Sequence, residues 1–337
     1  MGSVPLVRVD RGQEQESLHR GAVAVVDRDG RVRYAAGDPA LPLYLRSAAK
    51  PLQAIPLVEF GGADALGLTD AELAVVCGSH AGEPVHVDAV RSILAKAGLD
   101  ERALQCGAHL PYSASDAAVL IREGRAPGAI HNNCSGKHAG MLAACRTRGW
   151  PVDSYRDPAH PLQREIAGIV AEFCGVPADE IPRGTDGCGV PTFQGTAADL
   201  GCAFARLADP SGLPGRRAEA VGRLTRSMVA HSVMVSGTGR LVTVLMTGLG
   251  DRLFCKGGAE GGFGLGLPGR GWGLAVKIED GNARGMGAVV LDALRQLGVV
   301  SPSELDALAA EHRPVLRNHE GRAVGEMRAV FTLEQVS

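Results

Sequence analysis

The stretch AVAVVDRDGRVRYA, residues 22–35, determines the fold class that we expect for this chain. The apolar run AVAVV (22–26) and the run RVRYA (31–35), in which arginine alternates with Val32 and Tyr34, flank the four residues Asp27–Gly30. Two short runs of this kind around an Asp- and Gly-containing turn are typical of a β-hairpin. The chain therefore begins in an antiparallel sheet.

The other end of the chain also favours strands. Residues 253–256, 263–267 and 272–278 form short, Gly-rich apolar runs, and residues 324–331 alternate like a closing strand. The middle instead has apolar residues at helical spacing, as does one segment near the end: 85–97, 135–148, 162–174, 197–207, 218–230 and 288–297. Strands at both ends predict an α+β fold, in which the terminal segments form one antiparallel sheet packed against a large helical region.

We expect a single domain over residues 1–337, with a helical subregion at about 60–235 and sheet-forming segments at about 4–40 and 250–332. With 45% hydrophobic residues, a chain of 337 residues can bury a full core. Its 35 Lys and Arg nearly balance its 37 Asp and Glu, which argues against nucleic acid or an anionic membrane as a partner. The sequence shows neither a signal peptide nor a membrane-spanning run, so we expect a cytoplasmic protein.

The first motif with catalytic potential is Ser47-Ala48-Ala49-Lys50, at a predicted helix start. Side chains at positions i and i+3 of a helix share one face, so Ser47 Oγ and Lys50 Nζ can meet. A neutral lysine can take the serine proton and create a nucleophile, which requires its pKa to fall well below about 10.4. Taken alone, this pattern is common by chance.

Two further segments extend the motif. Ser79 lies in a Gly-flanked loop after a predicted helix, and Lys256 stands at a strand end before two glycines. Each segment alone is an ordinary turn. In this order, however, the Ser-x-x-Lys, the loop serine and the Lys-Gly-Gly resemble the penicillin-recognising serine hydrolases, although those usually have Ser-Asp-Asn and Lys-Thr-Gly as second and third elements.

The most unusual stretch is HNNCSGKHAGM, residues 131–141, which is followed later by Cys188 in a second Gly-rich loop. Three interpretations stay open from the residues alone. Cys134 and Cys188 can hold a zinc-like ion, with His138 as the ordinary third ligand and Lys137 as a chemically unusual one. Cys134 can be a nucleophile at a helix N-terminus beside His138. Both cysteines can also be free thiols in polar turns.

Together these segments resemble the serine-type bacterial L-asparaginase II family, the thermolabile, Rhizobium-type class. The resemblance covers most of the chain, and the cysteine-containing stretch is its most specific part. The matching stretches are LRSAAKPLQ (45–53), CGSHAGE (77–83), HNNCSGKHAGM (131–141), DGCGVP (186–191) and KGGAEG (256–261).

The resemblance implies a serine β-lactamase-like α+β fold, usually a homodimer, that hydrolyses L-asparagine to L-aspartate and ammonia. It also implies two Ser–Lys pairs, Ser47 with Lys50 and Ser79 with Lys256. The implied cofactor is zinc, bound by Cys134, Lys137 and Cys188.

Substrate contacts are inferred from position alone. We expect Asp186 and Glu260 to face the substrate ammonium, and Arg46, Asn133 and His138 to supply polar contacts. One extra methylene group changes an enzyme's preference between two substrates by only about 10–200-fold, so the sequence does not separate asparagine from glutamine. A related amidase, such as a glutaminase or a β-lactam-type hydrolase, is therefore an alternative. A non-catalytic, zinc-stabilised amino-acid sensor on the same fold is another, and it would bind asparagine without releasing ammonia.

Overall fold

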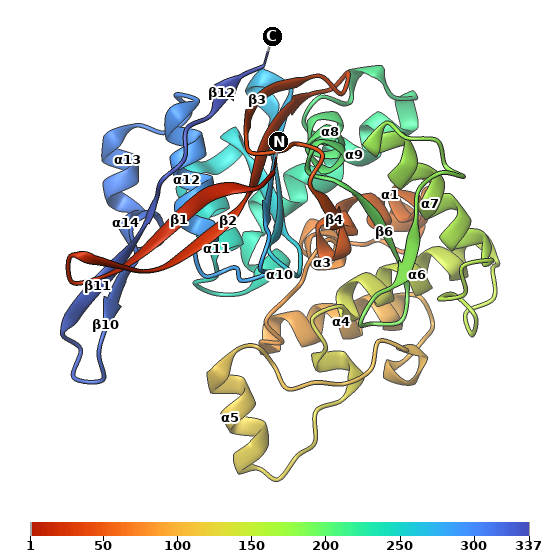
Figure 1. Ribbon diagram of the computed structural model, residues 1–337. Coiled ribbons are helices and arrows are strands. Elements are labelled where there is room, and N and C mark those ends of the chain that lie inside the picture. Colours follow the sequence, from red (N-terminus) through yellow and green to blue (C-terminus); the bar gives the residue numbers. More distant parts are fainter. Residues whose placement is uncertain (1, 337) are drawn as a thin grey trace.

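The computed structural model describes residues 2–336, and in this part of the chain nine strands form one antiparallel sheet (Figure 1). The strand order is β10-β11-β1-β2-β9-β8-β7, and β3 pairs with both β2 and β12. The strands are β1 (Val4–Arg11), β2 (Glu14–Asp27), β3 (Val32–Ala36), β7 (Phe254–Gly257), β8 (Gly262–Leu267), β9 (Trp272–Ile278), β10 (Val315–Arg317), β11 (Ala323–Ala329) and β12 (Glu334–Gln335).

The predicted hairpin is the turn between β2 and β3. Val25 pairs with Tyr34 across it, and Gly30 has a φ of +84° that favours glycine. Asp27 Oδ1 accepts the backbone N–H groups of residues 29 and 31, which closes the turn. Because β1 also pairs with β11, both ends of the chain lie in one sheet. The predicted α+β architecture is confirmed.

The helices form most of the middle of the chain, close to the predicted ranges. They are α1 (Lys50–Glu59), α2 (Gly62–Ala65), α3 (Asp70–Val76), α4 (Pro84–Lys96), α5 (Ala114–Arg122), α6 (Ser135–Arg148), α7 (Pro161–Cys174), α8 (Ala197–Ala208), α9 (Gly215–Ala230), α10 (Ser232–Ser236) and α11 (Leu241–Leu249). Three more follow the last Gly-rich strand: α12 (Met286–Gln296), α13 (Pro302–Ala307) and α14 (Ala309–His312).

Helix α8 joins the helical region to the sheet by packing on β2, β8 and β9. The contact with β9 is very close, because a Cβ atom on Gly273 would lie 1.9 Å from the carbonyl oxygen of Gly201. Glycine at this position therefore lets helix backbone rest on strand backbone. Helix α12 packs on β1, β9 and β11 (Figure 1).

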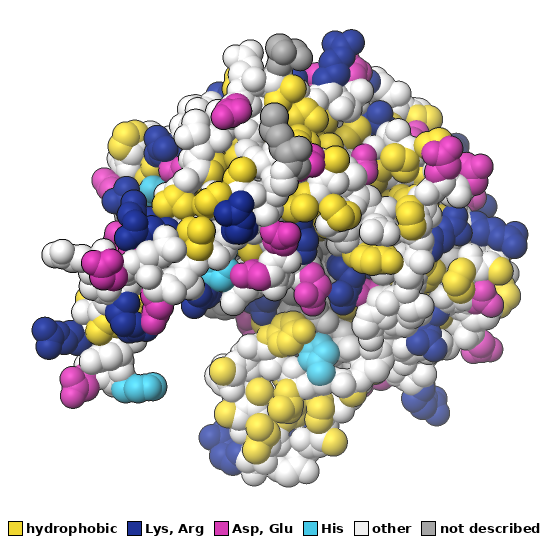
Figure 2. All heavy atoms as spheres, in the orientation of Figure 1, with side chains coloured by type: hydrophobic (Ala, Val, Ile, Leu, Met, Phe, Trp, Pro, Cys, Tyr) yellow, Lys and Arg dark blue, Asp and Glu magenta, His cyan; other side chains and the backbone are white. Residues whose placement is uncertain are grey.

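Helix α5 stands apart from the rest of the helical region, at the lower end of the view (Figure 1). It buries only Leu120 among its own residues. Hydrophobic side chains gather on the surface around α5 (Figure 2). In this part of the chain Leu110, Tyr112 and Ile121 are exposed. None of the helices among residues 2–336 combines the length and apolar character needed to cross a membrane.

A small second sheet, which the sequence did not predict, positions the segment before Ser47. It consists of β4 (Pro42–Tyr44), β6 (Pro191–Thr196) and β5 (Arg183–Thr185), in that order. The N–H group of Leu45 donates to the carbonyl of Phe193 at 2.8 Å. This pairing places the start of the Ser-x-x-Lys motif beside the loop that carries Cys188.

Candidate active site

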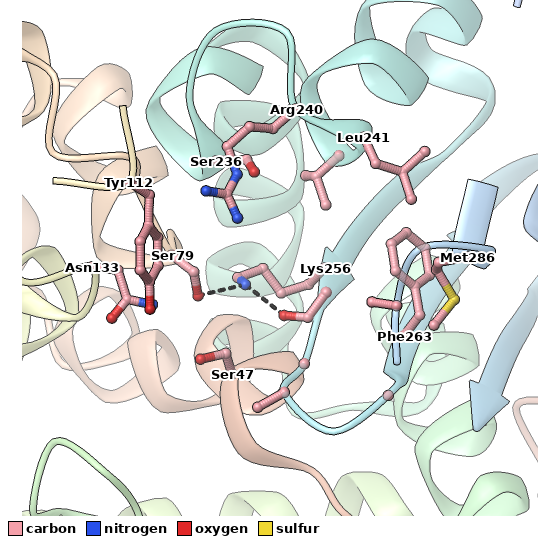
Figure 3. A pocket seen from close by; sticks show the side chains of 16 residues that line it. Ser47, Ser79, Tyr112, Asn133, Ser236, Arg240, Leu241, Lys256, Phe263 and Met286 are labelled. Carbon is pink, nitrogen blue, oxygen red and sulfur yellow. Dashed lines mark hydrogen bonds between the residues drawn. The ribbon is translucent and has the colours of Figure 1, made fainter. Parts of the chain in front are cut away.

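The hydroxyl of Ser79 lies between two lysine amines that come from distant parts of the chain. Lys50 Nζ donates to Ser79 Oγ at 2.9 Å. Lys256 Nζ donates to the same oxygen at 2.8 Å, the bond drawn between Lys256 and Ser79 in Figure 3. Lys50 begins α1 and Lys256 lies in β7, and both are almost completely buried. The Ser79 N–H group donates to the carbonyl of Val235, which fixes the loop behind the hydroxyl.

Lys50 makes two more hydrogen bonds inside the protein. Its amine donates to the carbonyl oxygens of Gly78 at 2.6 Å and Asn133 at 3.1 Å. It therefore joins the Ser79 loop to the stretch that carries Cys134.

Burial controls the protonation of both amines. It lowers the pKa of Lys50, and it lowers the pKa of Lys256 well below its usual range, with the charges of Lys50 and Arg240 acting in the same direction. A neutral Lys256 amine can accept the Ser79 proton instead of donating to its oxygen. The pair thus has the chemistry of a serine and its base.

Ser47 lies in the 3₁₀ helix Arg46–Ala49 that precedes α1. The predicted hydrogen bond between Ser47 and Lys50 is not formed, since no hydrogen bond in the described part of the chain joins these side chains. The reason lies in the tertiary structure, because the Lys50 amine donates instead to three oxygens in the interior: the carbonyls of Gly78 and Asn133 and the hydroxyl of Ser79. Arg46 has a φ of +46°, a left-handed conformation that strains a residue other than glycine at the start of this motif.

Ser47 and Ser79 share one cavity of about 310 Å³ (Figure 3). Predicted residues Asn133 and Lys256 also line it. None of its lining residues is acidic. The remaining lining residues, which the sequence analysis did not select, are Tyr112, Ser236, Arg240, Leu241, Val242, Gly257, Gly258, Ala259, Gly262, Phe263, Ala283 and Met286.

His80 connects the Ser79 loop to α6. Gly82 N–H donates to His80 Nδ1 at 3.2 Å, so the proton is on Nε2, which donates to Ser135 Oγ at 2.9 Å. The Ser135 hydroxyl in turn donates to the carbonyl of Ile130. Burial holds the pKa of His80 well below its usual range, so the ring is neutral and this chain of donors is fixed.

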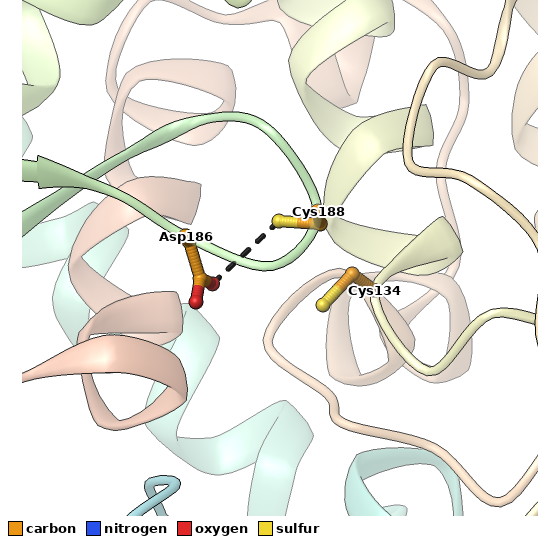
Figure 4. Close-up of side chains that lie close together, drawn as sticks. All are labelled: Cys134, Asp186 and Cys188. Carbon is orange, nitrogen blue, oxygen red and sulfur yellow. Dashed lines mark hydrogen bonds between the residues drawn. The ribbon is translucent and has the colours of Figure 1, made fainter.

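Next to Ser79 lies a group of metal-ligating side chains that we call the thiol cluster: Cys134, Asp186 and Cys188 (Figure 4). Their ligand atoms all lie within 4.8 Å of one another. Lys137 Nζ donates to Cys188 Sγ at 2.9 Å. Two thiol sulfurs and a carboxylate oxygen are donors that zinc accepts, so the residues fit this ion.

Charges and hydrogen bonds around the thiol cluster lower the pKa of Cys134 and raise the pKa of Lys137. A hydrogen bond from Cys188 lowers the pKa of Cys134 well below its usual range, and the nearby Lys50 and Lys137 charges act in the same direction. Burial alone would lower the pKa of Lys137. The charges of the two cysteines and Asp186 have a larger effect in the opposite direction, so the pKa of Lys137 is raised. The lowered pKa favours the thiolate form of Cys134, which is the form that binds metals.

Four predicted substrate contacts, Arg46, His138, Asp186 and Glu260, do not line the cavity. Asp186 forms an ion pair with Arg46 and belongs to the thiol cluster. His138 is fully buried, with Nδ1 2.6 Å from the Tyr155 hydroxyl, because it lies one residue further round α6 than Lys137. Glu260 is exposed outside the cavity. His138 is also absent from the thiol cluster, against its prediction from ligand chemistry.

The sequence model of L-asparaginase II matches residues 7–329, nearly the whole chain. The chain belongs to the L-asparaginase II family. Membership implies an amidohydrolase, as the sequence resemblance predicted. A comparison with curated proteins finds no match.

Three solved structures are distantly similar to this member of the L-asparaginase II family. A beta-lactamase from Mycobacterium bovis is 20% identical, with 87% of this chain and 94% of that chain covered and a TM-score of 0.39. Simvastatin synthase from Aspergillus terreus is 13% identical, with coverages of 77% and 85% and a TM-score of 0.39. The native form of Mglu is 18% identical, with coverages of 85% and 66% and a TM-score of 0.35. We draw nothing further from similarities at this level.

Proposed function

We propose that this chain hydrolyses L-asparagine to L-aspartate and ammonia by Ser–Lys nucleophilic catalysis. The observation that carries the proposal is the position of Ser79 Oγ, within hydrogen-bond distance of two buried lysine amines and in the same cavity as Ser47. Family membership supports an amide as the substrate.

Ser47 is the nucleophile in this proposal, because its hydroxyl lines the cavity and makes no hydrogen bond to another described residue. Its oxygen bonds to the amide carbon while its proton passes through Ser79 to the neutral amine of Lys256. The carbon–nitrogen bond then breaks, and the same proton leaves with ammonia. Water finally adds to the ester, which releases aspartate and restores Ser47.

Zinc is part of the proposal. Cys134 and Cys188 would hold it, with Lys137, as the family resemblance implies, or Asp186, as the thiol cluster suggests, completing the protein ligands. When bound, the ion supplies a fixed positive charge that can orient a polar group of the substrate.

The metal assignment is tested by loading the purified protein with cobalt, whose bonds to thiolates absorb light. We expect C134S and C188S to remove this absorption, and only one of K137M and D186N to shift it. A cobalt spectrum without thiolate bands, or metal analysis that finds no zinc in protein purified with zinc present, would remove the metal from the proposal.

Three further predictions remain proposals: a single domain, a homodimer and a cytoplasmic location. The first is supported by the contiguous hydrophobic core, which includes Val25 of the sheet, Leu142 of α6 and Phe204 of α8.

The nucleophile is tested with S47A and S79A, measured by ammonia release from L-asparagine and L-glutamine. We expect S47A to lose nearly all activity and S79A to lose about 10²–10⁴-fold, the range for a proton-transfer group. The matched control is S227A, because Ser227 is buried in α9 without a hydrogen-bond partner and lies outside the cavity. Near-normal ammonia release by S47A would refute the assignment.

A diazoketone analogue of asparagine gives an independent readout, since it traps the attacking hydroxyl as a stable adduct. We expect peptide mapping by mass spectrometry to place the adduct on Ser47, and an adduct on Ser79 would exchange the two roles. Tight asparagine binding with no ammonia from the wild type would favour the amino-acid sensor. Hydrolysis of a β-lactam but of neither amide would favour the β-lactam-type hydrolase.

A further inference from the structure

Arg240 is the one cationic residue of the cavity that no prediction from the sequence included. Its guanidinium projects from the loop before α11 toward the ring of Tyr112 (Figure 3), 5.3 Å from the ring centroid. No ion pair joins it to an acidic residue of the described chain. Arg46, by contrast, is already neutralised by Asp186. The cavity thus contains an arginine whose charge has no counterion.

The loop that carries Arg240 is fixed to the Ser79 loop. Thr238 donates to the carboxylate of Glu83 through its N–H group at 2.8 Å and its hydroxyl at 2.9 Å. Gly237 has a φ of +120°, and a Cβ atom there would lie 2.5 Å from the Cβ of Ala81. The position of Arg240 relative to the reacting groups is therefore built into the fold.

Tyr112 extends this arrangement into a wall of the cavity. Its ring stacks on His109, with centroids 4.8 Å apart, and His109 Nε2 accepts the N–H group of Asn133 at 3.0 Å. The rings of His109 and Tyr112 and the guanidinium of Arg240 thus form a continuous series of contacts that starts at Asn133. Stacking uses the face of a guanidinium and leaves its N–H groups free for a planar anion.

We propose that Arg240, held against Tyr112, binds the α-carboxylate of the substrate, so that the cavity selects amides that also carry a carboxylate. This inference rests on the proposed amidase function. It follows from the unpaired guanidinium and from a lining without acidic side chains. Arginine binds carboxylates through two parallel N–H groups, which suits a fixed amino-acid headgroup.

The test compares L-asparagine with β-alaninamide, which is asparagine without its α-carboxylate. We expect R240M to lower kcat/KM about 10- to 100-fold more for L-asparagine than for β-alaninamide, mainly through KM, because any effect of the Arg240 charge on Lys256 is common to both substrates. R240K keeps the charge and should restore part of the loss. An equal loss on both substrates would mean a structural role and overturn the proposal, as would an unchanged KM for L-asparagine.

The matched control is R270M. Arg270 also stacks on an aromatic ring, 5.2 Å from the centroid of Trp272, but it lies outside the cavity. We expect R270M to behave like the wild type on both substrates. If R46M, and not R240M, removes the preference for L-asparagine, the carboxylate binds at Arg46 and the proposal is wrong.

A binding measurement separates this proposal from the amidase function. L-aspartate and β-alanine differ by the same α-carboxylate, and calorimetry of the S47A variant measures their affinities without turnover. We expect S47A to bind L-aspartate more tightly than β-alanine. In the double variant that carries both S47A and R240M, most of that difference in affinity should be lost. Lack of ammonia release by the wild type would refute the amidase function alone, whereas equal L-aspartate affinity with and without Arg240 would refute the anion site alone.

Discussion

At the scale of single residues, the site depends on amines that the fold has moved out of water. Lys50 has 0% and Lys256 2% of its surface exposed, and neither forms an ion pair with a carboxylate of the described residues. Desolvation disfavours the charged form of such an amine and lowers its pKa. The same burial that creates a base therefore also costs stability.

Replacing Lys256 with methionine should separate these two effects. We expect K256M to lose about 10²–10⁴-fold in kcat, and to raise the free energy of unfolding at neutral pH by on the order of 1–4 kcal/mol, because an apolar chain of similar length replaces a buried amine. Ammonia release and denaturant titration measure the two quantities. The control is K277M at the partly buried Lys277, which should keep activity. A K256M protein that is less stable than the wild type would contradict this account of burial.

The pH dependence follows from the same lowered pKa. The Lys256 amine accepts a proton only when it is neutral, and its pKa in the folded protein lies well below its ordinary value of 10.5. We therefore expect kcat/KM to rise from acid through neutral to mildly alkaline pH. The contribution of Lys256 to stability should rise with pH between its lowered pKa in the folded protein and its ordinary pKa, because in that window the unfolded chain binds more protons than the folded one. A flat or acid-optimal activity profile would contradict a lysine base.

At the scale of elements, the site depends on the close contact between α6, which follows Cys134, and α3, which precedes Ser79. Gly136 and Gly140 of α6 make this contact: a Cβ on Gly136 would lie 2.3 Å from the carbonyl oxygen of Val75, and one on Gly140 would lie 2.4 Å from a methyl carbon of Val76. Glycine costs about 1 kcal/mol relative to alanine inside a helix. The approach of the two helices accounts for its presence in both positions.

The substitution G140A tests this contact. We expect it to lower the free energy of unfolding by about 1–3 kcal/mol, because the added methyl group overpacks the contact with Val76. The matched control is G168A in α7, where nothing lies within 4 Å of the added Cβ, and which should be neutral or stabilising by up to about 1 kcal/mol. Adding V76A should recover part of the loss. Equal effects of G140A and G168A in denaturant titrations would rule out the contact as the cause.

At the scale of the whole molecule, the two ends of the chain lie in one sheet, and the proposed catalytic groups come from both the helical region and the sheet. Ser47 lies in the 3₁₀ helix before α1, Lys50 begins α1 and Ser79 follows α3, whereas Lys256 lies in β7. A change in how the helical part packs on the sheet would therefore separate Lys256 from Ser79. The proposal of a single domain requires these parts to unfold together.

The two tryptophans of the chain make this requirement measurable, since Trp150 follows α6 and Trp272 lies in β9. W272F leaves a fluorescence probe in the helical part, and W150F leaves one in the sheet. Within each single-tryptophan variant, we expect its fluorescence and far-ultraviolet circular dichroism to give the same denaturant midpoint, as for one cooperative unit. Non-coincident transitions within either variant would indicate two independently unfolding parts.

The site shows which kinds of interaction local sequence can predict. The family resemblance implied Ser79 and Lys256 as a pair, and Lys256 Nζ lies 2.8 Å from Ser79 Oγ. The Ser47–Lys50 pair was predicted from helical spacing and from the family resemblance, but no hydrogen bond joins the two side chains in the described residues, because the Lys50 amine donates to three other oxygens in the interior. Arg240 was missed for the opposite reason: nothing in its own segment shows that its charge lacks a counterion.

The sequence by itself determined the strands at both ends, the helices between them and the residue types that can carry amide hydrolysis. Hydrophobic periodicity and turn residues act between near neighbours, so they can be read along the chain. Only the tertiary structure decided that both buried amines meet at Ser79, that Asp186 joins the two cysteines, and that an unpaired arginine faces the cavity. These outcomes depend on burial and on partners far apart in the chain, and both exist only after the helical region packs on the sheet.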